Sequence, residues 1–223
     1  MGQDITLTAS DGFKLGGYRA DPAGTPKGGV VVIQEIFGVN NSIRKKCDEF
    51  AALGYVAVAP ALFDRTTPNF DSGYSPAEVE KARSFIAKPD LDAFLRDAQA
   101  AINEIKSAGP VGIVGFCLGG SVSFLSATRL SGLKAAVGYY GGMIAKFADE
   151  EPKCPVMLHF GATDASIPLT DVEAIKAKRP EIEVHVYDGA GHAFSNPDRT
   201  NFHPASAALA DKRTVEFFAK HLK

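Results

Sequence analysis

The stretch Gly115-Phe116-Cys117-Leu118-Gly119-Gly120 follows an apolar run, residues 111–114, and opens an amphipathic segment that continues to Arg129. A cysteine between glycines at a strand-to-helix turn is typical of a nucleophile elbow, with cysteine in the place of the usual serine. The glycines remove Cβ atoms that would clash where backbones pack closely around this strained turn. The start of a helix also favours a thiolate. Cys117 is therefore the candidate nucleophile; the alternative is a buried structural cysteine beside a glycine-rich turn.

On both sides of this stretch, strand-length apolar runs alternate with longer amphipathic segments. This order predicts an α/β fold with a mostly parallel central sheet and helices on both faces. Two alternating segments flank Ser10-Asp11-Gly12 and predict an N-terminal antiparallel hairpin over residues 4–9 and 13–19. The expected buried strands cover residues 29–35, 55–59, 111–115, 135–140, 155–160 and 182–187. The expected helices cover residues 42–53, 76–87, 91–108, 117–129, 169–178 and 204–222.

Turn residues fill the segment 63–74 and predict a loop that, together with the helix after it, covers part of the molecule. Neither a linker nor a repeat interrupts the alternation of strands and helices. We therefore expect residues 1–223 to form a single domain.

The charge and composition exclude several classes of protein. Among 223 residues, 24 are Lys or Arg and 26 are Asp or Glu, so the formal net charge is −2. This balance argues against nucleic-acid binding by bulk positive charge. The longest apolar runs are far shorter than the ~20 residues that a membrane-spanning helix needs, and the start of the sequence carries no secretory signal pattern. We expect a cytoplasmic protein with neither nucleic acid nor a membrane as its partner.

A cysteine nucleophile needs a base and a residue that orients this base, and in elbow-type folds they follow the nucleophile in the order acid, histidine. Asp164 comes directly after the expected strand 155–160, and His192 comes after the strand 182–187, within Gly-Ala-Gly-His-Ala-Phe. Both therefore lie at the carboxyl edge of the sheet, where open α/β sheets bind ligands. The alternative for Asp164 is a helix N-cap or turn residue.

The other two cysteines lack this context. Cys47 lies within the expected helix 42–53, and Cys154 precedes a proline at the start of a strand. Three cysteines are too few, and odd in number, for a disulfide framework. We interpret Cys47 and Cys154 as packing residues.

Four stretches together resemble the dienelactone hydrolase (carboxymethylenebutenolidase) family, in order and over nearly the whole chain. They are residues 31–40 (VVIQEIFGVN), 115–120 (GFCLGG), 138–141 (GYYG) and 189–194 (GAGHAF). The resemblance implies an α/β-hydrolase fold and a Cys-His-Asp triad, which here falls on Cys117, His192 and Asp164. It also implies that neither a metal nor a cofactor takes part, and the sequence contains no phosphate-binding loop and no clear zinc-ligand cluster.

Glu35 ends an apolar strand, where a carboxylate is costly unless it is paired or catalytic. In the family that the chain resembles, the matching glutamate contacts the nucleophilic cysteine and helps to activate it when substrate arrives. Placed beside Cys117, Glu35 would hold the proton on the sulfur of the resting enzyme. The alternative is a carboxylate satisfied by loop N–H groups. The same loop is expected to supply one oxyanion donor, the N–H of Ile36, next to the N–H of Leu118.

The expected reaction is hydrolysis of a small-molecule ester or lactone by a monomer or small homo-oligomer. In the branch of the family that acts on dienelactone carboxylates, two arginines bind the substrate carboxylate, and Val79 and Asn196 align with them here. The candidates that replace them are Arg83 and Arg199, with Phe37 and Phe194 as further substrate contacts; Lys81 and Arg65 are neighbouring cations. The alternatives are a broad carboxylesterase or thioesterase with the same triad, and a non-catalytic binding module on the same fold.

Overall fold

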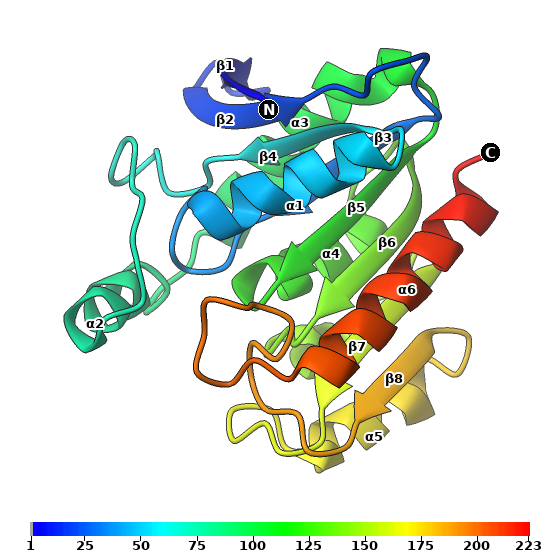
Figure 1. Ribbon diagram of the computed structural model, residues 1–223. Helices are drawn as coiled ribbons and strands as arrows, with labels where there is room; N and C mark the ends of the chain where they lie inside the picture. Colours follow the sequence, from blue (N-terminus) through cyan, green and yellow to red (C-terminus); the bar gives the residue numbers. More distant parts are fainter. Residues whose placement is uncertain (1) are drawn as a thin grey trace.

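The computed structural model describes residues 2–223, and one eight-stranded sheet forms its centre (Figure 1). In chain order the strands are β1 (Gln3–Thr8), β2 (Lys14–Ala20), β3 (Gly29–Ile33), β4 (Val56–Pro60), β5 (Val111–Phe116), β6 (Leu133–Tyr139), β7 (Val156–Gly161) and β8 (Glu183–Tyr187). Their order across the sheet is β1-β2-β4-β3-β5-β6-β7-β8. β2 pairs antiparallel with both β1 and β4, and the other neighbours pair in parallel.

Helices cover both faces of this sheet. The helices are α1 (Asn41–Ala52), α2 (Pro76–Phe85), α3 (Leu91–Ile105), α4 (Leu118–Arg129), α5 (Leu169–Lys178) and α6 (Pro204–His221), with short 3₁₀ turns at Lys106–Ala108 and Ile144–Phe147. Figure 1 shows α1 and α6 in front of the sheet and α3 and α4 behind it. α2 stands apart from the sheet, at the end of the long loop that follows β4.

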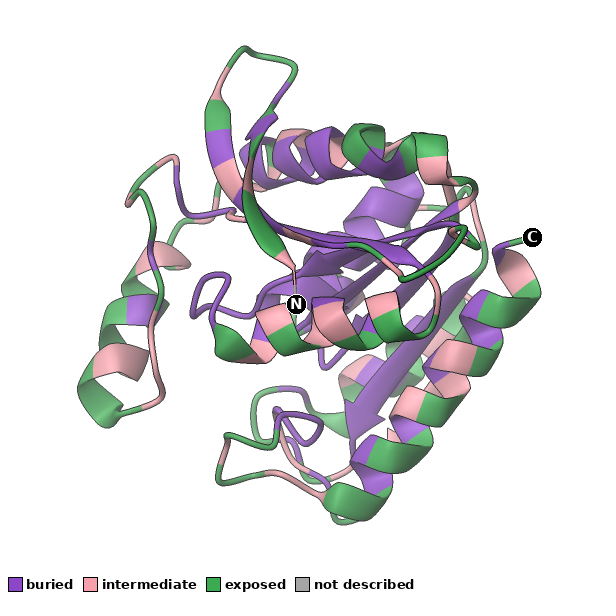
Figure 2. Ribbon diagram, turned by 45° about the horizontal axis from the view of Figure 1, so that its top comes forward, coloured by how far each residue is buried: buried purple, intermediate pink, exposed green. Residues whose placement is uncertain are grey.

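The central strands β3, β4 and β5 are buried along their whole length and consist almost entirely of Val, Ala, Ile and Gly. Continuous apolar runs of this kind are what parallel strands need when helices cover both faces. Figure 2 shows the buried colour over the central strands of the sheet, while much of the edge strand β1 and the outward faces of the helices are exposed. Burial of this apolar surface is the main force that holds the layers together.

Register and close packing bring the ends of β3 and β5 together. Ile33 lies opposite Gly115 in the parallel pairing, so the chain leaves both strands at the same edge of the sheet. The start of α4 then approaches the end of β3 so closely that a Cβ atom at Gly119 would lie 2.4 Å from the carbonyl oxygen of Ile33. Only glycine fits this position. The segments that follow β3 and β5 therefore lie side by side.

The observed architecture confirms the predicted α/β-hydrolase fold class, with its mostly parallel sheet and N-terminal hairpin. The differences are at element ends. β3 stops at Ile33 rather than at residue 35, because Gln34 and Glu35 already turn out of the sheet. The helix expected over 91–108 ends at Ile105 and continues as a single 3₁₀ turn.

Candidate active site

Cys117 occupies the sharp turn between β5 and α4, with φ 55° and ψ −114°. A positive φ is strained for any residue with a side chain, and such strain is typical of a nucleophile held on an elbow. The turn also depends on Gly115, where a Cβ atom would lie 2.0 Å from the carbonyl oxygen of Gly119. The predicted elbow is therefore present, and it leaves the Cys117 side chain partly exposed at the carboxyl edge of the sheet.

The structure brings His192 and Asp164 to this cysteine in the predicted order. Nε2 of His192 lies 3.2 Å from Sγ of Cys117, and Nδ1 of the same ring lies 2.7 Å from Oδ2 of Asp164. The other oxygen of Asp164 accepts a hydrogen bond from the N–H of Ser166, at 2.8 Å. Asp164 thus serves as a turn residue, which was the alternative interpretation of its role, and it also bonds to His192.

Electrostatics around His192 favour its charged form. Burial alone would lower the pKa of the ring, but the hydrogen bonds to Asp164 and Cys117 outweigh burial and raise it to about 10. The Asp164 side chain is only 1% exposed and the His192 side chain 24%. The raised pKa favours the imidazolium form of His192 near neutral pH.

A cavity of about 340 Å³ opens in front of the pair. Cys117 and His192 form part of its wall, together with Ile36 and Leu118. The N–H of Leu118 is the first of helix α4, so it has no acceptor within the helix. Within residues 2–223, no acceptor is found for the N–H of Ile36 either. Both predicted oxyanion donors are thus unpaired backbone groups in the wall that holds the sulfur.

Among the described residues, no hydrogen bond joins Glu35 to Cys117, the contact that the family resemblance implied. The Glu35 side chain is buried, and its Oε2 accepts a hydrogen bond of 2.8 Å from Nδ2 of Asn196. Within the described chain, the hydrogen-bond partner of the Cys117 sulfur is His192 instead. Burial raises the pKa of Glu35, although the Asn196 hydrogen bond and the positive charge of Arg199 oppose this. The carboxylate is bonded to the amide at residue 196.

Three of the four predicted substrate-contacting residues line the cavity, namely Phe37, Arg83 and Arg199. The Arg199 guanidinium carbon lies 5.1 Å from the ring centre of Phe37 and 5.2 Å from that of Tyr74. Among ion pairs of the described residues, none includes Arg199. Its N–H groups are therefore available to a ligand.

Phe194 is the exception, and its prediction as a substrate contact is wrong. It is 0% exposed and packs against Tyr139, Tyr140 and Tyr187 in the core. The reason is local: Ala193 has φ 61°, so the chain reverses after His192 and turns the next side chain inward.

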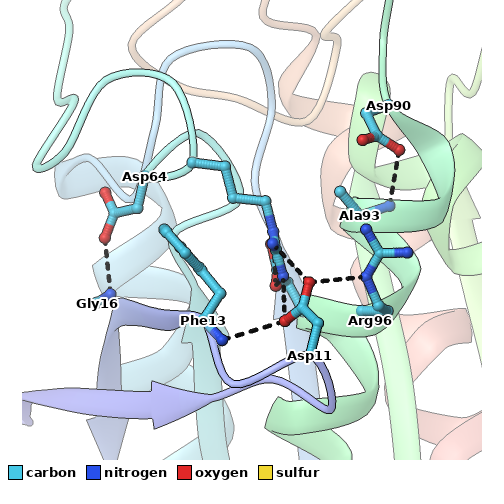
Figure 3. Close-up of polar contacts among 9 residues, drawn as sticks. Asp11, Phe13, Gly16, Asp64, Asp90, Ala93 and Arg96 are labelled. Carbon is cyan, nitrogen blue, oxygen red and sulfur yellow. Dashed lines mark hydrogen bonds and ion pairs between the residues drawn. The ribbon is translucent and has the colours of Figure 1, made fainter.

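The neighbouring cations Arg65 and Lys81 do not line the cavity. Arg65 bonds to Asp97, which is fully buried, and to Asp11. Figure 3 shows the same Asp11 accepting hydrogen bonds from Arg96 and from the N–H of Phe13. Arg65 therefore ties the N-terminal hairpin to α3, which is a structural role.

Tyr74, which supports the site, was missed from the sequence. Tyr74 ends the long loop before α2, and its hydroxyl accepts hydrogen bonds of 3.0 Å from the amides of Asn40 and Asn196. Its ring meets that of Phe37 edge-on, at 4.8 Å between centres. The sequence did offer a sign of this role, because Tyr74 is an aromatic residue in a segment, 63–74, that consists mainly of turn-forming residues. The segment was predicted to cover part of the molecule, and α2 does so at this cavity, which Val79, Arg83 and Ile86 line.

Residues 2–223 contain neither a candidate metal site nor a candidate membrane-spanning helix. In that part of the chain, no cluster of three or more His, Cys, Asp or Glu side chains is arranged to bind a metal ion. Nor does any of its helices combine the length and the apolar composition that crossing a bilayer requires.

Two solved structures are similar to this chain in fold. A crystal structure described as a dienelactone hydrolase, from Klebsiella pneumoniae subsp. pneumoniae, has a TM-score of 0.86 and 30% identity over 99% of each chain. A dienelactone hydrolase-like phosphotriesterase from metagenomic libraries has a TM-score of 0.78 over 99% of this chain and 98% of its own, but only 20% identity. The second likeness concerns the fold alone.

Comparison of sequences identifies the family. The model of the dienelactone hydrolase family matches residues 15–222. A carboxymethylenebutenolidase of Pseudomonas putida is 33% identical over 229 residues, which cover 97% of this chain and 96% of the relative. A second such enzyme, from Pseudomonas knackmussii, has the same identity and coverage. The chain therefore belongs to the dienelactone hydrolase family and is a hydrolase that acts on esters or lactones.

Proposed function

We propose that Cys117 is the nucleophile of a hydrolase that cleaves a lactone or carboxylic ester through an acyl-enzyme. The observation that carries the proposal is the chain of contacts from Cys117 Sγ to His192 Nε2 and from His192 Nδ1 to Asp164. This chain opens onto a cavity large enough for a small ester. Nucleophile, base and orienting acid are thus within hydrogen-bond reach of one another.

In the first half of the reaction, the thiolate of Cys117 attacks the carbonyl carbon of the ester. The negative charge that develops on the carbonyl oxygen is held by the N–H groups of Ile36 and Leu118. His192 then donates its Nε2 proton to the leaving oxygen, and the carbon–oxygen bond breaks. A thioester on Cys117 remains, and the alcohol, or the freed hydroxyl end of an opened lactone, is released.

In the second half, neutral His192 takes a proton from water, and the hydroxide formed attacks the thioester carbonyl. The acid product leaves as the carbon–sulfur bond breaks, and the imidazolium–thiolate pair is restored. Throughout, Asp164 fixes the tautomer of His192 and stabilises its positive charge. The raised pKa of His192, about 10, supports this role of the carboxylate.

For the substrate, the cavity wall supports an ester that carries a negative charge. Arg199 has free donors, and Arg83 lies on the α2 side of the same cavity. An arginine binds a carboxylate through two parallel hydrogen bonds. A second candidate is a broad carboxylesterase or thioesterase, favoured by the apolar part of the wall at Val79, Ile86 and Met143.

The test is hydrolysis of a panel of anionic lactones, neutral aryl esters and thioesters by the wild type and by Cys117→Ala. We expect the variant to lose turnover of every substrate that the wild type cleaves. Near-normal turnover by Cys117→Ala would exclude Cys117 as nucleophile. Faster cleavage of neutral aryl esters than of anionic lactones by the wild type would favour the broad esterase.

A further inference from the structure

The order of the strands gives the active-site cavity two sides. Cys117 follows β5, whose neighbours in the sheet are β3 and β6. Phe37 comes from the segment after β3 and Met143 from the segment after β6, and both line the cavity together with Cys117. A substrate held at the sulfur therefore meets one wall on the β3 side and another on the β6 side.

The wall on the β6 side is small and uncharged. Ser121, Gly142 and Met143 form it, and none of the three carries a charge. Gly142 adds no side chain, and a Cβ atom there would have only Ile167 within 4 Å, at 3.8 Å. Met143 is partly buried and is the largest side chain of the three. The free space on this side therefore depends on Met143.

The backbone around Met143 is held on both sides. Before it, Tyr140 has φ 38°, and such strain persists only where the surroundings fix the chain. Gly141 then passes so close to α4 that a Cβ atom there would lie 2.7 Å from the backbone nitrogen of Ser121. After Met143, the side chain of Ile144 is 0% exposed. The segment therefore cannot move away from the cavity without disturbing the core.

Ser121 connects this segment to the helix of the nucleophile. Its Oγ accepts a hydrogen bond of 3.0 Å from the N–H of Met143. Ser121 lies one turn after Cys117 in α4, and its own N–H donates to the carbonyl oxygen of Cys117 at 3.4 Å. It is 1% exposed, so water does not readily replace the bond to Met143. The position of Met143 is therefore coupled to that of Cys117.

We propose that Met143, held by Ser121, is a specificity-determining residue that limits the size of the substrate group on the β6 side of the Cys117 sulfur. The inference rests on the proposed function of Cys117. The substrates are then esters or lactones in which the group on this side is short and uncharged. Because methionine is unbranched and adaptable, the limit is gradual, and longer groups bind with increasing difficulty.

The size of the effect follows from the side chain that is removed. Truncation of Met143 to alanine frees space for about three chain atoms. A longer substrate group that enters this space buries additional apolar surface, which favours its binding. A short ester leaves the space empty and gains nothing. Met143 therefore controls the size preference of the enzyme rather than its overall activity.

The test is the kcat/KM for two series of neutral esters. In p-nitrophenyl alkanoates from acetate to hexanoate the acyl group grows, and in alkyl acetates from methyl to hexyl acetate the alcohol grows. We expect Met143→Ala to raise the ratio of kcat/KM for the longest ester to that for the shortest at least about tenfold in one series. That series identifies the part of the ester on the β6 side. Equal ratios in the wild type and in Met143→Ala, in both series, would overturn the proposal.

Met143→Leu is the matched control, because leucine has nearly the same volume. It should change the ratio less than about twofold. Ser126→Ala is the control for a lost serine, since Ser126 is a buried residue of α4 that bonds to the carbonyl oxygen of Val122 outside the cavity. It should leave the ratio unchanged. A shift of the ratio as large as that of Met143→Ala in either control would overturn the assignment to the Met143 side chain.

Ser121→Ala gives an independent variant that removes the acceptor of the Met143 N–H and keeps the Met143 side chain. It should raise the same ratio, less than Met143→Ala does, and should have no further effect in the Met143→Ala background. An equal change in kcat/KM for every ester would overturn the role of Ser121. If Met143→Ala does not fold, an unchanged ratio in Ser121→Ala overturns the proposal by itself. Failure of the proposed function has a different signature, which is retained hydrolysis of these esters by Cys117→Ala.

Discussion

The sulfur of Cys117 lies 3.2 Å from Nε2 of His192, although the two residues follow strands that stand three places apart in the sheet. The contact depends on two left-handed residues, Cys117 itself with φ 55° and Ala193 with φ 61°. The first turns the sulfur out of the sheet edge, and the second reverses the chain directly after the histidine. The backbone thus fixes the pair before any substrate enters.

Among the three cysteines, Cys117 should react with iodoacetamide selectively at neutral pH. Burial raises the pKa of Cys47 far above its ordinary value and that of Cys154 to about 11, so both remain protonated thiols. We expect the Cys117 peptide to be labelled at least about a hundredfold faster than either of the others. Comparable labelling of Cys154 would contradict the role of the imidazolium beside Cys117.

Asp164→Asn should lower kcat by about 10⁴-fold while the protein stays folded. An amide at this position favours the wrong tautomer of His192 and no longer stabilises the imidazolium. Steady-state kinetics with circular dichroism as the folding check measures the effect. Asp188→Asn, in the turn that precedes His192 but without a bond to its ring, is the matched control and should retain activity. If Asp164→Asn is less stable but keeps a normal kcat, Asp164 serves only as a turn residue.

The same substitution should affect stability in a pH-dependent way. The pKa of His192 is about 10 in the native protein and 6.5 ordinarily, so the folded state binds a proton that the unfolded state releases between these values. The contribution of this His192 proton to the free energy of unfolding is complete below pH 6.5 and is lost as the pH rises through about 10. Denaturant unfolding at pH 6 should show Asp164→Asn less stable than the wild type by about 2 kcal/mol. A difference that grows towards pH 10 would contradict the assigned pKa shift.

Arg199→Met should distinguish anionic from neutral substrates. Because Arg199 has free donors in the cavity wall, its loss should lower kcat/KM for carboxylate-bearing esters about tenfold and change that for neutral esters less than about twofold. Lys81→Met is the matched control, since Lys81 is an exposed cation on α2 outside the cavity, 5.6 Å from the ring of Phe70. Equal losses for both substrate classes would show that Arg199 only supports the wall.

Much of the fold could be predicted because its pattern is local. Short apolar runs in the sequence indicate the buried strands, and longer periodic segments between them indicate the amphipathic helices. The position of the elbow follows from the glycines around Cys117. Asp164 and His192 follow from chain order alone, because each comes directly after a strand and the strands end at one edge of the sheet.

The residues whose positions were wrongly predicted from the sequence are held by contacts between distant segments. Glu35 was expected at the sulfur, but its partner Asn196 comes from a loop 161 residues later. Phe194 was expected in the cavity because it neighbours His192, yet the left-handed Ala193 between them turns it into the core. Tyr74 had no periodic pattern around it that would reveal its role. Such pairings depend on side-chain packing, which the hydrophobic pattern alone does not specify.

The most direct test of the proposed mechanism is to trap its intermediate. The wild type is mixed with excess p-nitrophenyl acetate, quenched with acid within one turnover, digested and analysed by mass spectrometry. We predict a single acetyl group on the peptide that contains Cys117, which accumulates more strongly in Asp164→Asn, where water attack is slow, and is absent from Cys117→Ala. An acetyl group on another residue, or turnover by Cys117→Ala with a normal rate, would contradict the assignment of Cys117 as the nucleophile.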